Sequence, residues 1–145
     1  MKKLLNLLLI IFLFGLLISV RAFIEPFFYD PFILYFKNDY LHKSIPTLNI
    51  PNYFLHVFCR YVVNTLISLS IIFVIFKNRL NVVFALKFYA LALIFLSLSL
   101  FLILKLEVFQ NTLALFYVRR FLIQPLFIFI LIPAFFYQNL LNSDK

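Results

Sequence analysis

The sequence predicts an all-α membrane protein with four transmembrane helices, and three observations lead to this class. Hydrophobic residues make up 66% of the 145 residues and charged residues only 12%, and the mean hydropathy is +1.09. Soluble domains are about 45–50% apolar and about 25% charged. The apolar residues also gather in four runs, each close to the roughly 20 residues that cross a bilayer.

The four predicted spans are separated by short polar segments and by one long loop. They cover residues 4–20, 53–76, 82–104 and 113–137. The first span is followed by Arg21 and lacks the small-residue cleavage site of a secretory signal, so we expect an uncleaved helix. Pro125 and Pro133 fall within the last span, where they predict kinks. A polar tail follows at 139–145.

The long loop, residues 21–52, is interrupted by four prolines and carries eight aromatic residues between Phe23 and Tyr40. Prolines break a continuous helix. Aromatic rings favour the headgroup region of a bilayer. The loop is therefore predicted to lie along the membrane surface.

Basic residues predict the orientation of the chain. With the N-terminus inside, five of the nine basic residues that flank the spans are cytoplasmic, and they occupy short flanks, where the positive-inside rule acts best. These five are Lys2, Lys3, Lys77, Arg79 and Lys145. The prediction is that both termini are cytoplasmic and that the loop at 21–52 is extracytoplasmic.

Four basic residues fall inside the predicted spans, where each charge costs about 2.5–3.5 kcal/mol on insertion scales. Lys87 lies near a helix end and can extend its side chain to the interface. Arg60 shares one helical face with Asn64 and Ser68, which follow at i+4 and i+8. This face is predicted to lie in the outer third of the bilayer.

The other two charges within a predicted span are the adjacent pair Arg119 and Arg120, at a similar depth in the last span. Tyr117 and Gln124 stand at i−3 and i+4 from Arg120, on its face. We expect the two polar faces to meet each other or a common partner. The candidate lipid- or partner-binding site is therefore Arg60, Asn64, Ser68, Tyr117, Arg119, Arg120 and Gln124.

Guanidinium groups close together repel each other unless an anion lies between them. Within the chain the candidates are Glu25, Asp30, Asp39 and Glu107. Outside it they are lipid phosphates or an acidic group on another protein, because Arg binds both with paired hydrogen bonds. Internal pairing and a partner site both remain open at this point.

The same residues argue against nucleic-acid binding and leave two alternative functions. The basic residues are scattered between apolar runs and form no stripe for nucleic acid, and no metal cluster, cofactor motif or nucleotide fingerprint is present. Cys59 beside Arg60, with His56 one helical turn away, suggests a membrane thiol enzyme as an alternative. A small oligomeric transporter is a further alternative, although no acidic residue lies in any span. The oligomeric state is not predicted.

Several segments resemble a known family. They are Phe116 to Leu126, Leu131 to Gln138, Arg21 to Phe23, Phe28 to Pro31, and Arg60 to Ser68. The chain resembles, along its whole length, the small exosortase F system-associated membrane proteins of flavobacterial Bacteroidetes. The paired arginines followed by Gln-Pro within a span are the most specific part.

This resemblance implies an accessory protein of the bacterial inner membrane that acts beside an exosortase, a multi-spanning enzyme of protein sorting. It implies no catalytic role here, because Cys59-Arg60 lacks the Gly and Ser residues expected around an exosortase nucleophile. The expected function is a non-catalytic accessory protein whose arginines contact the exosortase or lipid.

Overall fold

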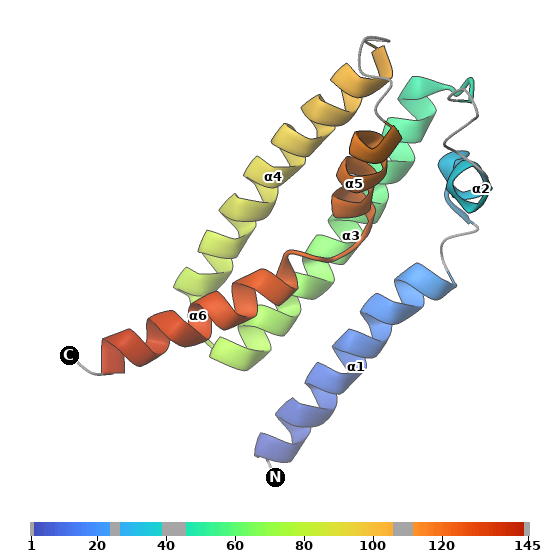
Figure 1. The fold of residues 1–145 in the computed structure, drawn as a ribbon. Coiled ribbons are helices and arrows are strands. Elements are labelled where there is room, and N and C mark those ends of the chain that lie inside the picture. Colours follow the sequence, from blue (N-terminus) through green and yellow to red (C-terminus); the bar gives the residue numbers. More distant parts are fainter. Residues whose placement is uncertain (1, 24–26, 39–45, 106–111, 144–145) are drawn as a thin grey trace.

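The computed structural model describes residues 2–23, 27–38, 46–105 and 112–143. This part of the chain forms helices and no strand, which confirms the predicted all-α class there. The helices are α1 (Lys2–Ala22), α2 (Phe32–Lys37), α3 (Ile50–Phe76), α4 (Arg79–Lys105), α5 (Thr112–Ile123) and α6 (Ile128–Ser143), arranged as in Figure 1.

Three of these helices are long and apolar enough to cross a membrane, and four spans result if α5 and α6 together form one bent span. At a rise of 1.5 Å per residue, the 27 residues of α3 extend over about 40 Å, more than the hydrocarbon core of about 30 Å. The chain is therefore compatible with a multi-pass membrane protein, as its composition predicts. The helices exceed the predicted spans by one to three residues at most of their ends.

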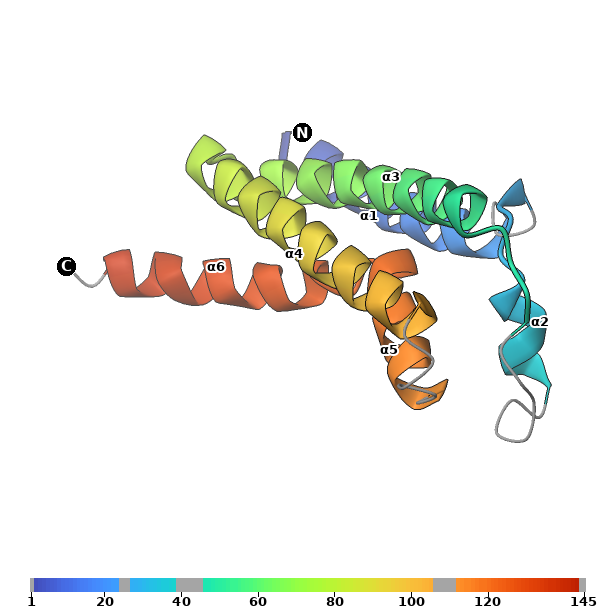
Figure 2. The ribbon, with the colours of Figure 1, turned by 90° about the horizontal axis from the view of Figure 1, so that it is seen from above.

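The central helix of the bundle is α3, which contacts α1, α4 and α5. Figure 2 shows α1 and α4 beside α3, with α5 below. A two-residue turn joins α3 to α4. Lys77 ends α3 in the left-handed region at φ 50°, and the Asn78 side chain accepts a hydrogen bond of 2.9 Å from the Leu80 N–H at the start of α4.

The predicted fourth span is divided at Pro125, where α5 and α6 meet at an angle of 62°. Because proline has no N–H group, the helical ladder is interrupted, and the Leu126 N–H bonds to the Gln124 carbonyl at 2.8 Å. Kinking at Pro125 is thus confirmed, whereas Pro133 lies inside α6 without interrupting it. The helix continues to residue 143, six residues beyond the predicted end of the span, so the first part of the predicted polar tail is helical.

The long loop contributes to the core of the protein. One described segment of the loop, residues 27–38, contains α2 and packs against the first turns of α3. Phe32 is fully buried, and its ring lies 5.3 Å from that of Tyr53. Residues 21–22 and 50–52, predicted as loop, belong to α1 and α3. The aromatic composition of this segment therefore serves packing against the bundle.

A second, smaller core joins α1 to the bundle. Its buried members are Leu17 and Val20 of α1, Ile67 and Ile71 of α3, and Ile128 of α6. The opposite face of α1 is exposed, and so is most of the outer face of α4. In a bilayer these faces meet lipid chains or other membrane helices.

Candidate functional site

The central helix α3 places Arg60, Asn64 and Ser68 on its inner face. Their spacing of four residues returns each side chain to the same side of the helix. The exposed fraction is 3% for Arg60, 5% for Asn64 and 0% for Ser68. The structure thus places all three in the interior of the bundle, on one face as predicted.

Arg119 of α5 forms a nearly buried ion pair with Asp30, which immediately precedes α2. The Arg119 Nε and Nη2 groups donate to the two carboxylate oxygens at 3.3 Å and 2.5 Å. The exposed fractions of the two side chains are 9% and 4%. This two-point geometry is the strong form of an arginine–carboxylate contact. Of the four acidic candidates, Asp30 is therefore one that pairs internally, while Glu25, Asp39 and Glu107 lie outside the described residues.

Asp30 also holds the start of α2. Its Oδ1 atom accepts a hydrogen bond of 3.2 Å from the Phe32 N–H, and its carbonyl accepts one from Ile33. A carboxylate at a helix start satisfies N–H groups that have no partner within the helix. Asp30 thus connects the fold of the 27–38 segment to the position of Arg119.

Aromatic rings from the 27–38 segment cover both buried guanidinium groups. The Arg60 guanidinium carbon lies 5.9 Å from the ring centre of Phe28, and that of Arg119 lies 5.7 Å from the ring centre of Phe36. Such cation–π contacts are strongest where water is excluded. Burial raises the pKa of the Tyr35 phenol, which belongs to the same segment.

Tyr53, in the first turn of α3, is buried against the same 27–38 segment that covers Arg60 and Arg119. The Tyr53 side chain is fully buried, and its ring centre lies 5.3 Å from that of Phe32. We name the group formed by Asp30, Tyr53, Arg60 and Arg119 the buried arginine site. Arg60 and Arg119 are thus buried beneath the same segment of the chain.

Arg120, next in sequence to Arg119, lies outside the buried arginine site. It is exposed, its Nε donates to Gln124 Oε1 at 3.1 Å, and its guanidinium lies over the Phe116 ring at 6.0 Å. Tyr117 is 55% exposed and contacts the same ring. The predicted face of Arg120 and Gln124 therefore exists, but it faces away from Arg60.

Asn64 forms a hydrogen bond with the backbone of α5. Its Nδ2 group donates to the carbonyl oxygen of Ile123 at 3.0 Å. Ile123 is the last residue of α5, just before the break at Pro125, where the carbonyl has lost its helical partner. Membrane helices tolerate such breaks only where a side chain, a water molecule or a neighbouring helix satisfies the freed group. Asn64 supplies this contact.

Three tyrosines near these residues were not predicted as part of a site. Tyr53 belongs to the buried arginine site, and the Tyr61 hydroxyl donates to the Tyr89 carbonyl at 2.7 Å, which joins α3 to α4. Tyr53 precedes Arg60 by seven residues, so helical spacing alone placed it on the face of Arg60, Asn64 and Ser68. Aromatic abundance hid this signal, because the chain holds 8 tyrosines and 22 phenylalanines.

The two residues proposed for thiol catalysis, Cys59 and His56, have surroundings different from those of the arginines. Cys59 is exposed on α3, and His56 contacts the rings of Phe28 and Tyr29 at 5.9 Å and 6.4 Å. In the described parts of the chain, no three His, Cys, Asp or Glu residues stand together as metal ligands would.

The geometry separates two kinds of arginine in what the sequence presents as one cluster. Arg60 and Arg119 lie in the interior, where Arg119 pairs with Asp30, and Arg120 stays accessible on the surface. Comparison with protein-family models, with curated proteins and with solved structures found no match.

Proposed function

We propose that the protein is a non-catalytic accessory protein of an exosortase-type protein-sorting system in the bacterial inner membrane. The resemblance of its arginine-bearing segments to exosortase F system-associated proteins supports this context. Three or four helices of membrane-spanning length support an integral location. The accessible group with which it would contact the enzyme, or lipid, is Arg120.

The proposal depends on the exposed and uncompensated charge of Arg120. Arg119 is already neutralised by Asp30, and Arg60 is covered by the 27–38 segment. Arg120 is exposed and is bound by the neutral amide of Gln124, so its charge is not compensated by that contact. An arginine in an apolar environment is stabilised by pairing with a carboxylate or phosphate. An acidic group on the exosortase fits this requirement.

Co-purification tests the proposal. The tagged protein is isolated from membranes that contain the exosortase of the same organism, and the recovered enzyme is quantified for wild type, Arg120→Gln and Arg120→Glu. Loss of one charge-assisted hydrogen bond is expected to reduce recovery by about tenfold, and the reversed charge by more. Lys105→Gln is the matched control, since Lys105 is also an exposed cation over a phenylalanine ring one turn earlier.

Wild-type recovery of the exosortase by Arg120→Glu would refute the role of Arg120. Failure of the wild-type protein to recover any exosortase would refute the accessory role itself. An equal loss in Lys105→Gln would mean that any surface cation suffices, and that the Arg120 face is not specific.

A transporter remains a second candidate because of one specific feature. The break between α5 and α6 lies beside buried polar groups of α3, and broken helices next to polar side chains form binding sites in many transporters. Ion or solute flux in reconstituted vesicles distinguishes the two functions. Flux above that of protein-free vesicles, lost in Asn64→Leu, would favour transport over an accessory role.

A further inference from the structure

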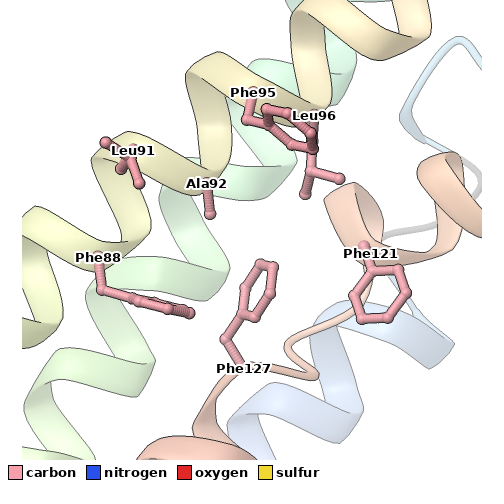
Figure 3. A pocket seen from close by; sticks show the side chains of 7 residues that line it. All are labelled: Phe88, Leu91, Ala92, Phe95, Leu96, Phe121 and Phe127. Carbon is pink, nitrogen blue, oxygen red and sulfur yellow. The ribbon is translucent and has the colours of Figure 1, made fainter.

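An apolar groove lies between α4 and the break that separates α5 from α6. It has a cavity volume of about 330 Å³ and is lined by Phe88, Ala92 and Leu96 of α4 and by Phe121 and Phe127 of the bent pair. Figure 3 shows Ala92 facing the Phe127 ring, with Phe88 to one side and Leu96 to the other. Because α6 turns away from α5 by 62°, it leaves this stretch of α4 partly uncovered.

The position of the groove restricts what can occupy it. Phe88 to Leu96 lie in the middle of a 27-residue helix that is long and apolar enough to cross a membrane. All the side chains that line the groove are apolar, so ordered water would find no hydrogen-bond partner there. A hydrocarbon chain matches both the depth and the lining.

A cation is next in sequence to the residues that line the groove on α4. Lys87 directly precedes Phe88 and lies one helical turn before Leu91, which also lines the groove. Lys87 is exposed, and within the described residues it makes no ion pair. Side chains on a helix lean toward its N-terminus. The ammonium group is therefore directed toward the α3–α4 turn, about 12 Å along the axis from Lys87, while the groove extends in the opposite direction.

We propose that this groove binds one acyl chain of a phospholipid whose phosphate is held by Lys87. The phosphate lies toward the membrane surface at the α3–α4 turn, where Lys77 and Arg79 are also exposed. The acyl chain runs from Lys87 past Phe88 and Ala92 toward Leu96. Charge at the surface end and an apolar lining along the depth together match one phospholipid molecule.

The experiment measures lipid bound to the purified full-length protein by native mass spectrometry. Delipidated protein in mild detergent is titrated with phosphatidylglycerol, and separately with diacylglycerol of the same chains. Phosphatidylglycerol is expected to bind with one molecule per chain. Diacylglycerol, which lacks the phosphate, is expected to bind about fivefold more weakly, as loss of one surface cation–phosphate contact implies.

Two variants test the two halves of the site. Ala92→Phe fills the groove and is expected to abolish stoichiometric binding of both lipids. Lys87→Gln is expected to weaken phosphatidylglycerol about fivefold and leave diacylglycerol unchanged. Lys105→Gln, a cation at the opposite end of α4, is the control and should bind like wild type. Lys87→Gln leaves the packing intact, so it decides the outcome even if Ala92→Phe does not fold.

Equal binding of phosphatidylglycerol by wild type and Lys87→Gln would overturn the role of Lys87. Equal binding by wild type and a folded Ala92→Phe variant would show that the lipid lies elsewhere on the surface. A dimer of the chain that forms in place of a lipid complex and is lost in Ala92→Phe would assign the groove to a second copy instead.

Discussion

The carboxylate of Asp30 has two separate structural roles. It accepts hydrogen bonds from the start of α2 and neutralises Arg119 across a separation of 89 residues. Removing one partner of a buried ion pair leaves the other charge uncompensated, and this penalty exceeds the net contribution of the pair itself. Asp30 therefore links the 27–38 segment to α5 by a buried ion pair.

Asp30→Asn is expected to lower the free energy of unfolding by about 3–5 kcal/mol, the cost of leaving a buried charge unpaired. Asparagine keeps the shape and can still cap α2, so the loss reports the charge alone. Denaturant titration in mixed micelles measures it. The double variant Asp30→Asn, Arg119→Gln should recover part of the loss, whereas Arg120→Gln, on the surface, should cost less than about 1 kcal/mol. An unchanged free energy of unfolding in Asp30→Asn would contradict the burial of this pair.

Helical spacing predicts which residues share a face, but it does not predict which residues pair across the bundle. The spacing of Arg60, Asn64 and Ser68 was sufficient to predict a shared face. Nothing in the sequence distinguished Asp30 from the other acidic candidates as the partner of Arg119. Ion pairs between residues far apart in a chain depend on how the helices pack, and local periodicity carries no information about that packing.

Among the elements, the bent pair α5–α6 departs furthest from an ideal span. Pro125 accounts for the break, and the contact of Asn64 with the Ile123 carbonyl accounts for its tolerance inside an apolar bundle. The break also exposes the groove along α4. One proline thus leads to a lost hydrogen bond, a compensating side chain and a gap between helices.

Asn64→Leu is expected to destabilise the protein by about 1–3 kcal/mol, because the Ile123 carbonyl then remains buried without a donor. Amide hydrogen exchange should increase specifically at residues 124–130, next to the break. Ser70→Ala is the matched control, since the Ser70 hydroxyl bonds within α3 to the Leu66 carbonyl and lies on the exposed face. Unchanged exchange at 124–130 in Asn64→Leu would show that the break does not depend on this contact.

At the scale of the whole molecule, the two ends of the bundle differ in chemistry. The end at α2 contains the buried arginine site, and the end at the α3–α4 turn presents exposed Lys3, Lys77 and Arg79. Figure 1 shows the N-terminus and the α3–α4 turn toward the same end, with α2 toward the other. Cationic flanks favour the cytoplasmic side of a membrane.

Cysteine labelling in intact cells tests the orientation. In a Cys59→Ala background, single cysteines at Lys37 and at Asn78 are treated with a membrane-impermeant maleimide. We expect labelling of Lys37→Cys from outside, and labelling of Asn78→Cys only after the membrane is opened. The reverse pattern would contradict cytoplasmic termini, and labelling of both from outside would contradict a span by α3. Retained protein-sorting function in Cys59→Ala alone would also argue against a thiol enzyme.

The sequence by itself determined the helical class, the approximate bounds of the apolar helices and the presence of a proline kink in the last span, although it did not distinguish Pro125 from Pro133. These features depend on composition, periodicity and the missing N–H of proline, all of which are local. Only the tertiary structure decided that Arg119 pairs with Asp30, that Asn64 meets the Ile123 carbonyl, and that Arg120 faces outward. Adjacent residues on a helix point about 100° apart, so the packing of the bundle sends one arginine of the pair inside and leaves the other on the surface.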